Sequence, residues 1–175
     1  MNFQFYLEKL YDSENFKEFI KENPDAFLCS GFFIIDKTGK ETNKQHFDYY
    51  VPRMKKMFSF KMESGIEKVP VEMLTDKIPE KISVTCDFVF ENIEKMIVDE
   101  MEKQNVKSKI QKILLSLQKL DGKDFLVGTL FVSTFGMIRI HIDISKREII
   151  LFEKKSFFDI MKVSRKKKIN VLKKK

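Results

Sequence analysis

Two short motifs contain both histidines of the chain and pair each one with a carboxylate. They are His46-x-Asp48 and His141-x-Asp143. Residues i and i+2 of a β-strand project from the same face, so each imidazole should stand beside its carboxylate. If the two strands were neighbours, the four side chains could converge on a metal such as Zn²⁺.

A solvated surface is the simpler interpretation of the same residues. In MIRIHIDI (137–144), isoleucines alternate with Arg139, His141 and Asp143, which places the polar side chains on the outer face. Polar residues on such a face need no special purpose. We therefore predict local His–Asp contacts, with a metal site or an enzyme built on these strands as the third hypothesis.

Other catalytic and cofactor patterns are missing from the sequence. The 6 glycines are scattered and form neither G-x-x-x-x-G-K-[ST] nor G-x-G-x-x-G, the arrangements that bind phosphates through backbone N–H groups. There is no G-x-S-x-G motif, and neither Cys29 nor Cys86 has a histidine nearby in sequence. We predict no catalytic residue, no cofactor and no enzymatic activity.

The C-terminal residues 162–175 are strongly basic and hold no acid. Their eight cations are Lys162, Arg165, Lys166, Lys167, Lys168, Lys173, Lys174 and Lys175. Such a tail can be a disordered solubilising end, can bind RNA, DNA or another polyanion by counterion release, or can insert at an anionic membrane surface. The rest of the chain carries 25 bases against 26 acids, so the net charge of +7 comes from this tail.

The composition fits a folded protein of 175 residues in one domain, or in two small ones that share a core. Hydrophobic residues make up 43% of the chain, which is enough for a packed interior. Two cysteines are too few for a disulfide framework, and Cys29 lies in an apolar run where a thiol behaves as a small hydrophobe. The N-terminal residues lack the apolar stretch of a signal peptide, and no run of 18 apolar residues occurs, so we expect a cytoplasmic protein without a transmembrane segment.

The first part of the chain predicts one or two helices followed by three strands. Apolar residues recur at helical spacing up to Asn23-Pro24, with Asp12 or Ser13 as a second N-cap. Strands are expected at 26–36, 45–51 and 57–62, the first covered on both faces. Residues 63–84 indicate an irregular connection with room for one short strand.

The second part predicts two helices, three strands and a short final helix. The helices are expected at 88–103 and 106–120, the second ending at Asp121-Gly122 with glycine at the C′ position. Strands follow at 125–133, 137–144 and 148–153. Ser156 can cap a last helix at 157–163 before the tail at 164–175.

The two parts are similar enough to suggest a duplication. Phe16 and Phe19 correspond to Leu114 and Leu117 at an offset of 98, and the two His-x-Asp motifs lie 95 residues apart. Chance similarity between two antiparallel meanders that follow helices is the alternative.

The hairpin sequence RIHIDISKREIILFE, together with the helix and strands before it, resembles PepSY-like modules over residues 106–153. Asp143 and Glu148-Ile149-Ile150 match the final hairpin of that family, whereas Arg147 stands where the family usually has glycine. The resemblance implies a non-catalytic module that binds or inhibits partner proteins. Many members of the family are extracytoplasmic.

Together these patterns predict an α+β fold. It would consist of two helix-plus-three-strand units, 1–62 and 85–163, whose helices pack on antiparallel sheet. The leading functional hypothesis is a small non-enzymatic binding module of unknown partner. The alternative is a nucleic-acid-associated protein anchored by its tail.

Overall fold

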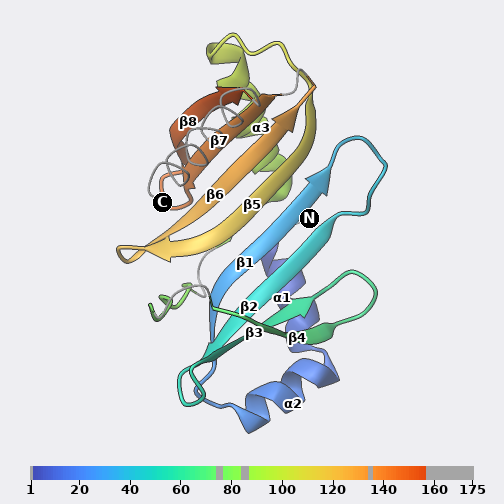
Figure 1. Cartoon of the computed structure of the whole chain (residues 1–175), viewed down its shortest axis with the longest axis vertical. Coiled ribbons are helices and arrows are strands. Elements are labelled where there is room, and N and C mark those ends of the chain that lie inside the picture. The colour runs from blue at the N-terminus through green and yellow to red at the C-terminus, as the bar shows by residue number, and fades with distance from the viewer. Residues whose placement is uncertain (1, 74–76, 84–86, 134–135, 157–175) are drawn as a thin grey trace, which may run out of the picture.

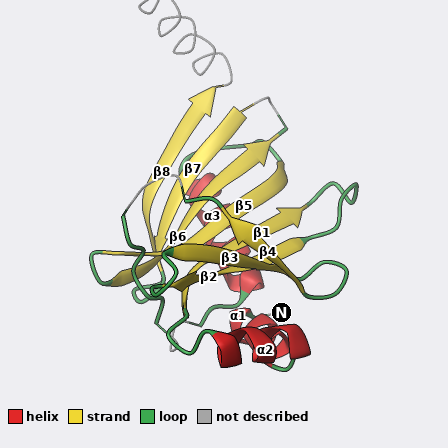
Figure 2. Cartoon of the chain, turned by 60° about the horizontal axis from the view of Figure 1, so that its bottom comes forward, coloured by secondary structure: helices red, strands yellow, loops and turns green. Residues whose placement is uncertain are grey.

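The fold is built on one sheet of eight antiparallel strands in a computed structural model that describes residues 2–73, 77–83, 87–133 and 136–156. The strand order is β4-β3-β2-β1-β5-β6-β7-β8 (Figure 1). Among the described residues, three helices pack on one face of this sheet: α1 (Phe3–Tyr11), α2 (Glu14–Glu22) and α3 (Phe90–Lys103). Figure 2 shows the twist of the sheet, with α1 and α2 side by side.

The strands form two four-stranded meanders. The first comprises β1 (Phe27–Asp36), β2 (Lys44–Val51), β3 (Lys56–Lys61) and β4 (Glu67–Val71). The second comprises β5 (Ile110–Leu120), β6 (Lys123–Val132), β7 (Gly136–Asp143) and β8 (Glu148–Ser156). The meanders join where β1 and β5 pair antiparallel, with Phe33 opposite Leu115.

The predicted pair of helix-plus-three-strand units is wrong, because the eight strands form a single sheet and residues 106–120 are not helical. Strand β5 occupies 110–120 and pairs on both sides, with β1 and with β6. Its apolar residues fit a helical period, but in the sheet Ile113, Leu115 and Leu117 alternate toward the helices and are fully buried. Asp121 and Gly122 form the β5–β6 turn, both at positive φ (49° and 75°), as an Asp-Gly hairpin turn requires.

This arrangement also removes the residue equivalences predicted for a duplication. Phe16 and Phe19 lie on α2, whereas Leu114 and Leu117 lie on β5. The two His-x-Asp motifs lie on β2 and β7, which are the second strand of one meander and the third of the other.

The helical N-terminal segment is confirmed as two helices. Ser13 caps α2 by accepting a hydrogen bond from the Phe16 N–H, and α2 ends at Glu22, before Asn23-Pro24. Aromatic rings then join these helices to the sheet. Phe16 and Phe19 both pack on Phe60. Their ring centroids lie 5.2 Å and 5.1 Å, respectively, from the ring centroid of Phe60.

The core lies between the helices and one face of the sheet. Its fully buried residues include Phe3, Leu7, Leu10, Phe19, Phe33, Phe47, Phe60, Ile97, Ile113, Leu115, Leu117 and Ile140. Apolar burial on this scale is the main source of the free energy of folding.

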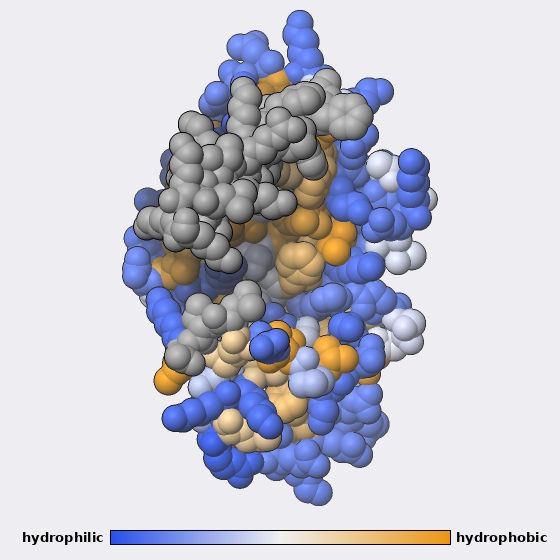
Figure 3. Space-filling model, viewed as in Figure 1, coloured by the Kyte–Doolittle hydropathy of each residue, from blue (hydrophilic) through white to orange (hydrophobic). Residues whose placement is uncertain are grey.

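The opposite face of the sheet carries no helix in the described part of the chain. It presents half-buried apolar side chains, among them Phe32, Ile34, Leu114, Val127 and Phe131, interspersed with polar ones. Figure 3 shows such apolar side chains near the middle of this face. No helix among the described residues is long and apolar enough to cross a membrane.

Candidate functional site

The two His-x-Asp motifs lie on the same face of the sheet, in matching rows. Pairing partners connect His46 to His141 through Phe32, Ser116 and Val127, one residue from each intervening strand. Four strand spacings of about 4.8 Å therefore separate the two histidines by about 19 Å. That distance is too great for shared coordination of one ion, and no cluster of three or more His, Cys, Asp or Glu suited to a metal occurs among the described residues.

Each motif instead makes local contacts. His46 Nε2 lies 2.6 Å from Glu63 Oε1, and Asp48 accepts a hydrogen bond from the Ser30 hydroxyl at 2.7 Å. His141 Nε2 is buried and has no hydrogen-bond partner among the described residues. Asp143 is almost fully buried and accepts hydrogen bonds in the turn that follows β7.

The basic residues predicted to bind anionic partners, Lys162 to Lys175, lie outside the described residues, as does the helix expected at 157–163. Binding of a polyanion by the tail stays a prediction.

The structure places a groove elsewhere, between α3 and the turn that joins β7 to β8. Its most enclosed part is a pocket of about 100 Å³ lined by Asp87, Phe88, Val89, Asn92, Ile93, Met96, Ile142, Ile144 and Arg147. Two more open hollows adjoin it, of about 380 Å³ toward the β5–β6 turn and about 280 Å³ toward the C-terminal half of α3. Arg147 lines all three, so the three hollows are grouped around this side chain.

Apolar side chains form the inside of the most enclosed pocket. Ile93 and Ile142 are buried, Phe88 is only 7% exposed, and Met96 is half-buried beside them. Ile93 and Met96 lie on one face of α3, three residues apart. Ile142 lies on the face of β7 that is turned toward the helices. The pocket therefore suits a compact apolar group.

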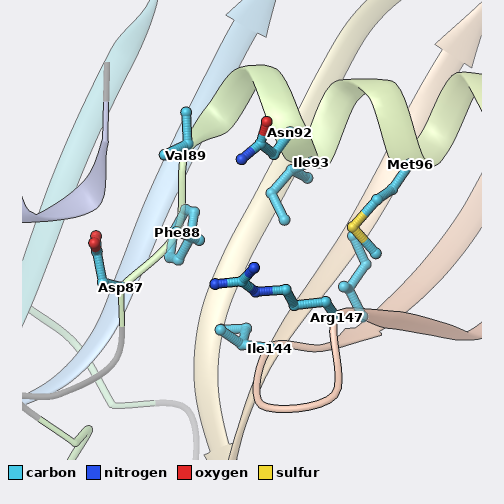
Figure 4. Close-up of a pocket in the computed structure, with 9 residues that line it drawn as sticks. Asp87, Phe88, Val89, Asn92, Ile93, Met96, Ile144 and Arg147 are labelled. Atoms are coloured by element: carbon cyan, nitrogen blue, oxygen red, sulfur yellow. The ribbon is translucent and has the colours of Figure 1, made fainter.

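Arg147 crosses the mouth of this pocket. Figure 4 shows its side chain extending from the β7–β8 turn over Ile144 toward Phe88, while the Asp87 carboxylate is turned away from the guanidinium. No hydrogen bond or ion pair joins this guanidinium to another described residue. The charge is thus available to a molecule that enters the groove.

The backbone of Arg147 is in the left-handed region, with φ at 53°. That conformation costs a residue with a Cβ about 1–2 kcal/mol relative to glycine. Three other non-glycine residues in the described part of the chain, Lys55, Asn105 and Asp121, share this conformation, but none of them lines the groove. Arg147 thus keeps a backbone conformation that favours glycine, beside a pocket. This suggests that its side chain has a function there.

Asp143 holds this turn in place. Its Oδ1 accepts hydrogen bonds from the Ser145 hydroxyl at 2.6 Å and from the Lys146 N–H at 3.1 Å. The Ser145 hydroxyl, followed by the Lys146 N–H, lowers the pKa of this carboxyl, which therefore stays ionised. Asp143 thus positions the segment that carries Arg147.

The N-terminus of α3 adds a weaker positive potential to the same end of the groove, offset in part by Glu91 in its first turn. Its N-cap residue, Val89, offers no side-chain acceptor to the first-turn N–H groups. A helix N-terminus carries partial positive charge. The other end of the groove is acidic. Its described lining includes three carboxylates, Asp99, Glu100 and Glu148, against two cations, Lys103 and Arg147.

Comparison with known proteins identifies a similar fold but assigns the chain to no family. No known family matches the chain, and no curated protein is significantly similar in sequence. A crystal structure of a protein described as a "putative lipoprotein" from Clostridium difficile superposes with a TM-score of 0.57 over 81% of this chain and 91% of that one. Their sequences are 12% identical, so the likeness concerns the fold alone. The resemblance to PepSY-like modules stays a prediction.

Proposed function

We propose that this protein is a non-enzymatic binding module whose ligand site is the groove between α3 and the β7–β8 turn. One observation supports this most directly: Arg147, whose guanidinium has no partner among the described residues, crosses the mouth of an apolar pocket. Ligand sites in proteins commonly combine an apolar lining with a few polar groups that fix orientation. The groove has both.

The residue types in the groove favour binding over catalysis. The described residues that line its three parts include no histidine and no cysteine. Of its serines, Ser83 accepts a hydrogen bond from Lys119 and Ser145 donates to Asp143, so both hydroxyls have structural partners. Among the described lining residues, neither hydroxyl is paired with a histidine, the side chain that most often serves as the general base in nucleophilic catalysis.

NMR spectroscopy of the labelled full-length chain tests the proposal. Isopentanol, isopentylamine and isopentanoate share one apolar group and differ in the charge of the head group. Added separately, at least one should shift the amide signals of Asn92, Ile93 and Ile144. If none of the three perturbs the groove, or if the shifts gather elsewhere in the protein, the groove is not a ligand site.

A pair of matched variants makes this test specific. Asn92 and Val98 are both exposed on α3, but only Asn92 lines the pocket. The Asn92→Phe variant should block the pocket and abolish the shifts, whereas Val98→Phe should leave them unchanged. Equal behaviour of the two variants would contradict the assignment of the site.

A further inference from the structure

We propose that the groove recognises a carboxylate joined to one compact apolar group. The carboxylate lies against Arg147, and the apolar group enters the pocket formed by Phe88, Ile93, Met96 and Ile142. This inference names the ligand class for the proposed function and rests on it.

The size of the pocket limits the apolar part. Sites for drug-sized molecules usually enclose roughly 300–1,000 Å³. The apolar pocket encloses about 100 Å³. It therefore holds a group of about the size of one aliphatic side chain, while the rest of the ligand must lie in the open hollows on either side.

The chemistry of Arg147 selects the anion. A guanidinium presents a planar fork of N–H donors that matches the two oxygens of a carboxylate, and such charge-assisted pairs are stronger than neutral hydrogen bonds. A phosphate would carry more charge than the groove offsets, because among the described residues Lys123 is the only other cation that lines this end, whereas Asp87 and Asp124 also line the hollow there. A single carboxylate fits this balance better.

The uneven charge along the groove gives the ligand a direction. Asp99, Glu100 and Glu148 repel an anion from the hollow at the C-terminal half of α3. The N-terminus of α3 attracts it to the other side of Arg147. The carboxylate is therefore held on the side of Asn92, and any further part of the ligand extends toward Asp99.

Two sources supply this chemistry: a free short-chain acid, or the C-terminus of a peptide that ends in an aliphatic residue. Both present a carboxylate beside one apolar group. They differ in the part that would lie in the acidic hollow, where a peptide backbone can donate N–H groups to Glu148 or Asp99.

N-acetyl-leucine and N-acetyl-leucine amide form the decisive pair of probes, because they differ in the carboxylate alone. Titrated into the labelled full-length chain, the acid should bind at least about tenfold more tightly than the amide. Arg147→Gln should remove that difference, and Arg147→Lys should restore part of it. Lys146→Gln, which changes a charge in the same turn but outside the groove lining, should leave the difference unchanged. A tripeptide that ends in leucine, compared with isopentanoate, distinguishes the two sources.

The outcomes separate this inference from the proposed function. Equal affinity for the acid and the amide, with shifts still located in the groove, would overturn the carboxylate and leave the groove as a binding site. If the preference for the acid persisted in Arg147→Gln, the assignment of Arg147 would be wrong. Absence of groove shifts with every probe would remove both proposals.

Discussion

The Asp143 carboxylate accepts a hydrogen bond from the Ser145 hydroxyl at 2.6 Å, and this contact shapes the turn that presents Arg147. Asp143 belongs to one of the two His-x-Asp motifs that suggested a metal site. Its structural role lies in the β7–β8 turn, at the edge of the groove. A residue that was a candidate ligand is thus a positioning residue for a different site.

Removing the Asp143 carboxylate should loosen this turn and weaken binding in the groove. We expect Asp143→Ala to reduce the affinity for N-acetyl-leucine several-fold, because Ser145 and Lys146 lose their shared acceptor. Asp143→Asn should reduce the affinity less, since the amide oxygen can still accept these hydrogen bonds. Amide shifts of residues 144–147 and the titration curve report the change.

Asp48→Ala is the matched control, because Asp48 occupies the same position in the other motif, on β2. It should leave the groove shifts and the affinity unaltered. If it weakened binding as much as Asp143→Ala, the effect would reflect general loss of sheet stability, and the positioning role would be rejected.

The Asp36 carboxyl, in the loop between β1 and β2, should become protonated only at a pH well below the usual range for aspartate. The Asp36 carboxylate accepts hydrogen bonds from the N–H groups of Glu41, Lys40 and Thr38 and from the Thr38 hydroxyl. These bonds, that from Glu41 above all, lower its pKa to about 2.

The folded-state pKa of Asp36 lies below the unfolded value of about 3.9, so its stabilisation is complete above that value and is lost as the pH falls toward 2. A carboxyl-detected NMR titration should give a midpoint near pH 2, with the Thr38 and Lys40 amides moving together. A midpoint near pH 4 would show that the loop bonds are weak. Asp36→Asn should abolish this transition.

Gly128 sits where neighbouring strands leave no room for a side chain. A Cβ at this position of β6 would lie 2.8 Å from Leu115 Cδ2 and 2.9 Å from Ile140 Cγ1. Because both neighbours are fully buried, Gly128→Ala should lower the free energy of unfolding by about 1–3 kcal/mol.

Urea unfolding measures this effect, with Gly136→Ala on β7 as the comparison. There the nearest atom to a new Cβ is Val132 Cγ2 at 3.2 Å, so the loss should be smaller. Equal stability of Gly128→Ala and the unaltered chain would mean that β5, β6 and β7 are not packed as described.

Cys29 should be chemically inert in the folded protein. Its thiol is 4% exposed, and burial raises its pKa to about 12, so the reactive thiolate is scarce at neutral pH. In a Cys86→Ser background, iodoacetamide at pH 8 should modify Cys29 only after urea is added. Prompt alkylation without urea would show that β1 opens readily.

The sequence predicted those helices and strands whose apolar pattern fitted only one type of secondary structure. The alternation of Ile138, Ile140 and Ile142 with polar residues identified β7. A second helix was expected to begin at Asp12 or Ser13, and the structure shows Ser13 as the cap of α2. The failure came at 106–120, where leucines and isoleucines satisfied both a helical and an alternating period. Tertiary pairing with β1 and β6 decided in favour of a strand.

A local signal could have prevented that error. Asp121-Gly122 between two apolar runs is a strong hairpin turn signal, and its interpretation as the end of a helix made the preceding segment helical as well. A two-residue turn before β6 would have required a strand at 110–120.

The groove was harder to foresee, because its lining comes from α3, β7, two turns and the segment before α3. Only the folded sheet brings these segments together. Arg147 gave one sign: the predicted resemblance to PepSY-like hairpins placed it at a position where glycine is usual, and the structure shows Arg147 in the backbone conformation that favours glycine.

The central claim is that the Arg147 guanidinium binds the carboxylate of the ligand. Replacement of Arg147 by glycine tests it most directly, because the preference for an anion should be lost while the stability of the fold is kept or raised. Relief of the left-handed conformation should keep or raise the free energy of unfolding, by up to about 1 kcal/mol, in a urea titration. Loss of the guanidinium should abolish the preference for N-acetyl-leucine over its amide. If Arg147→Gly instead kept that preference, Arg147 would not be the anion-binding group and the account would be contradicted.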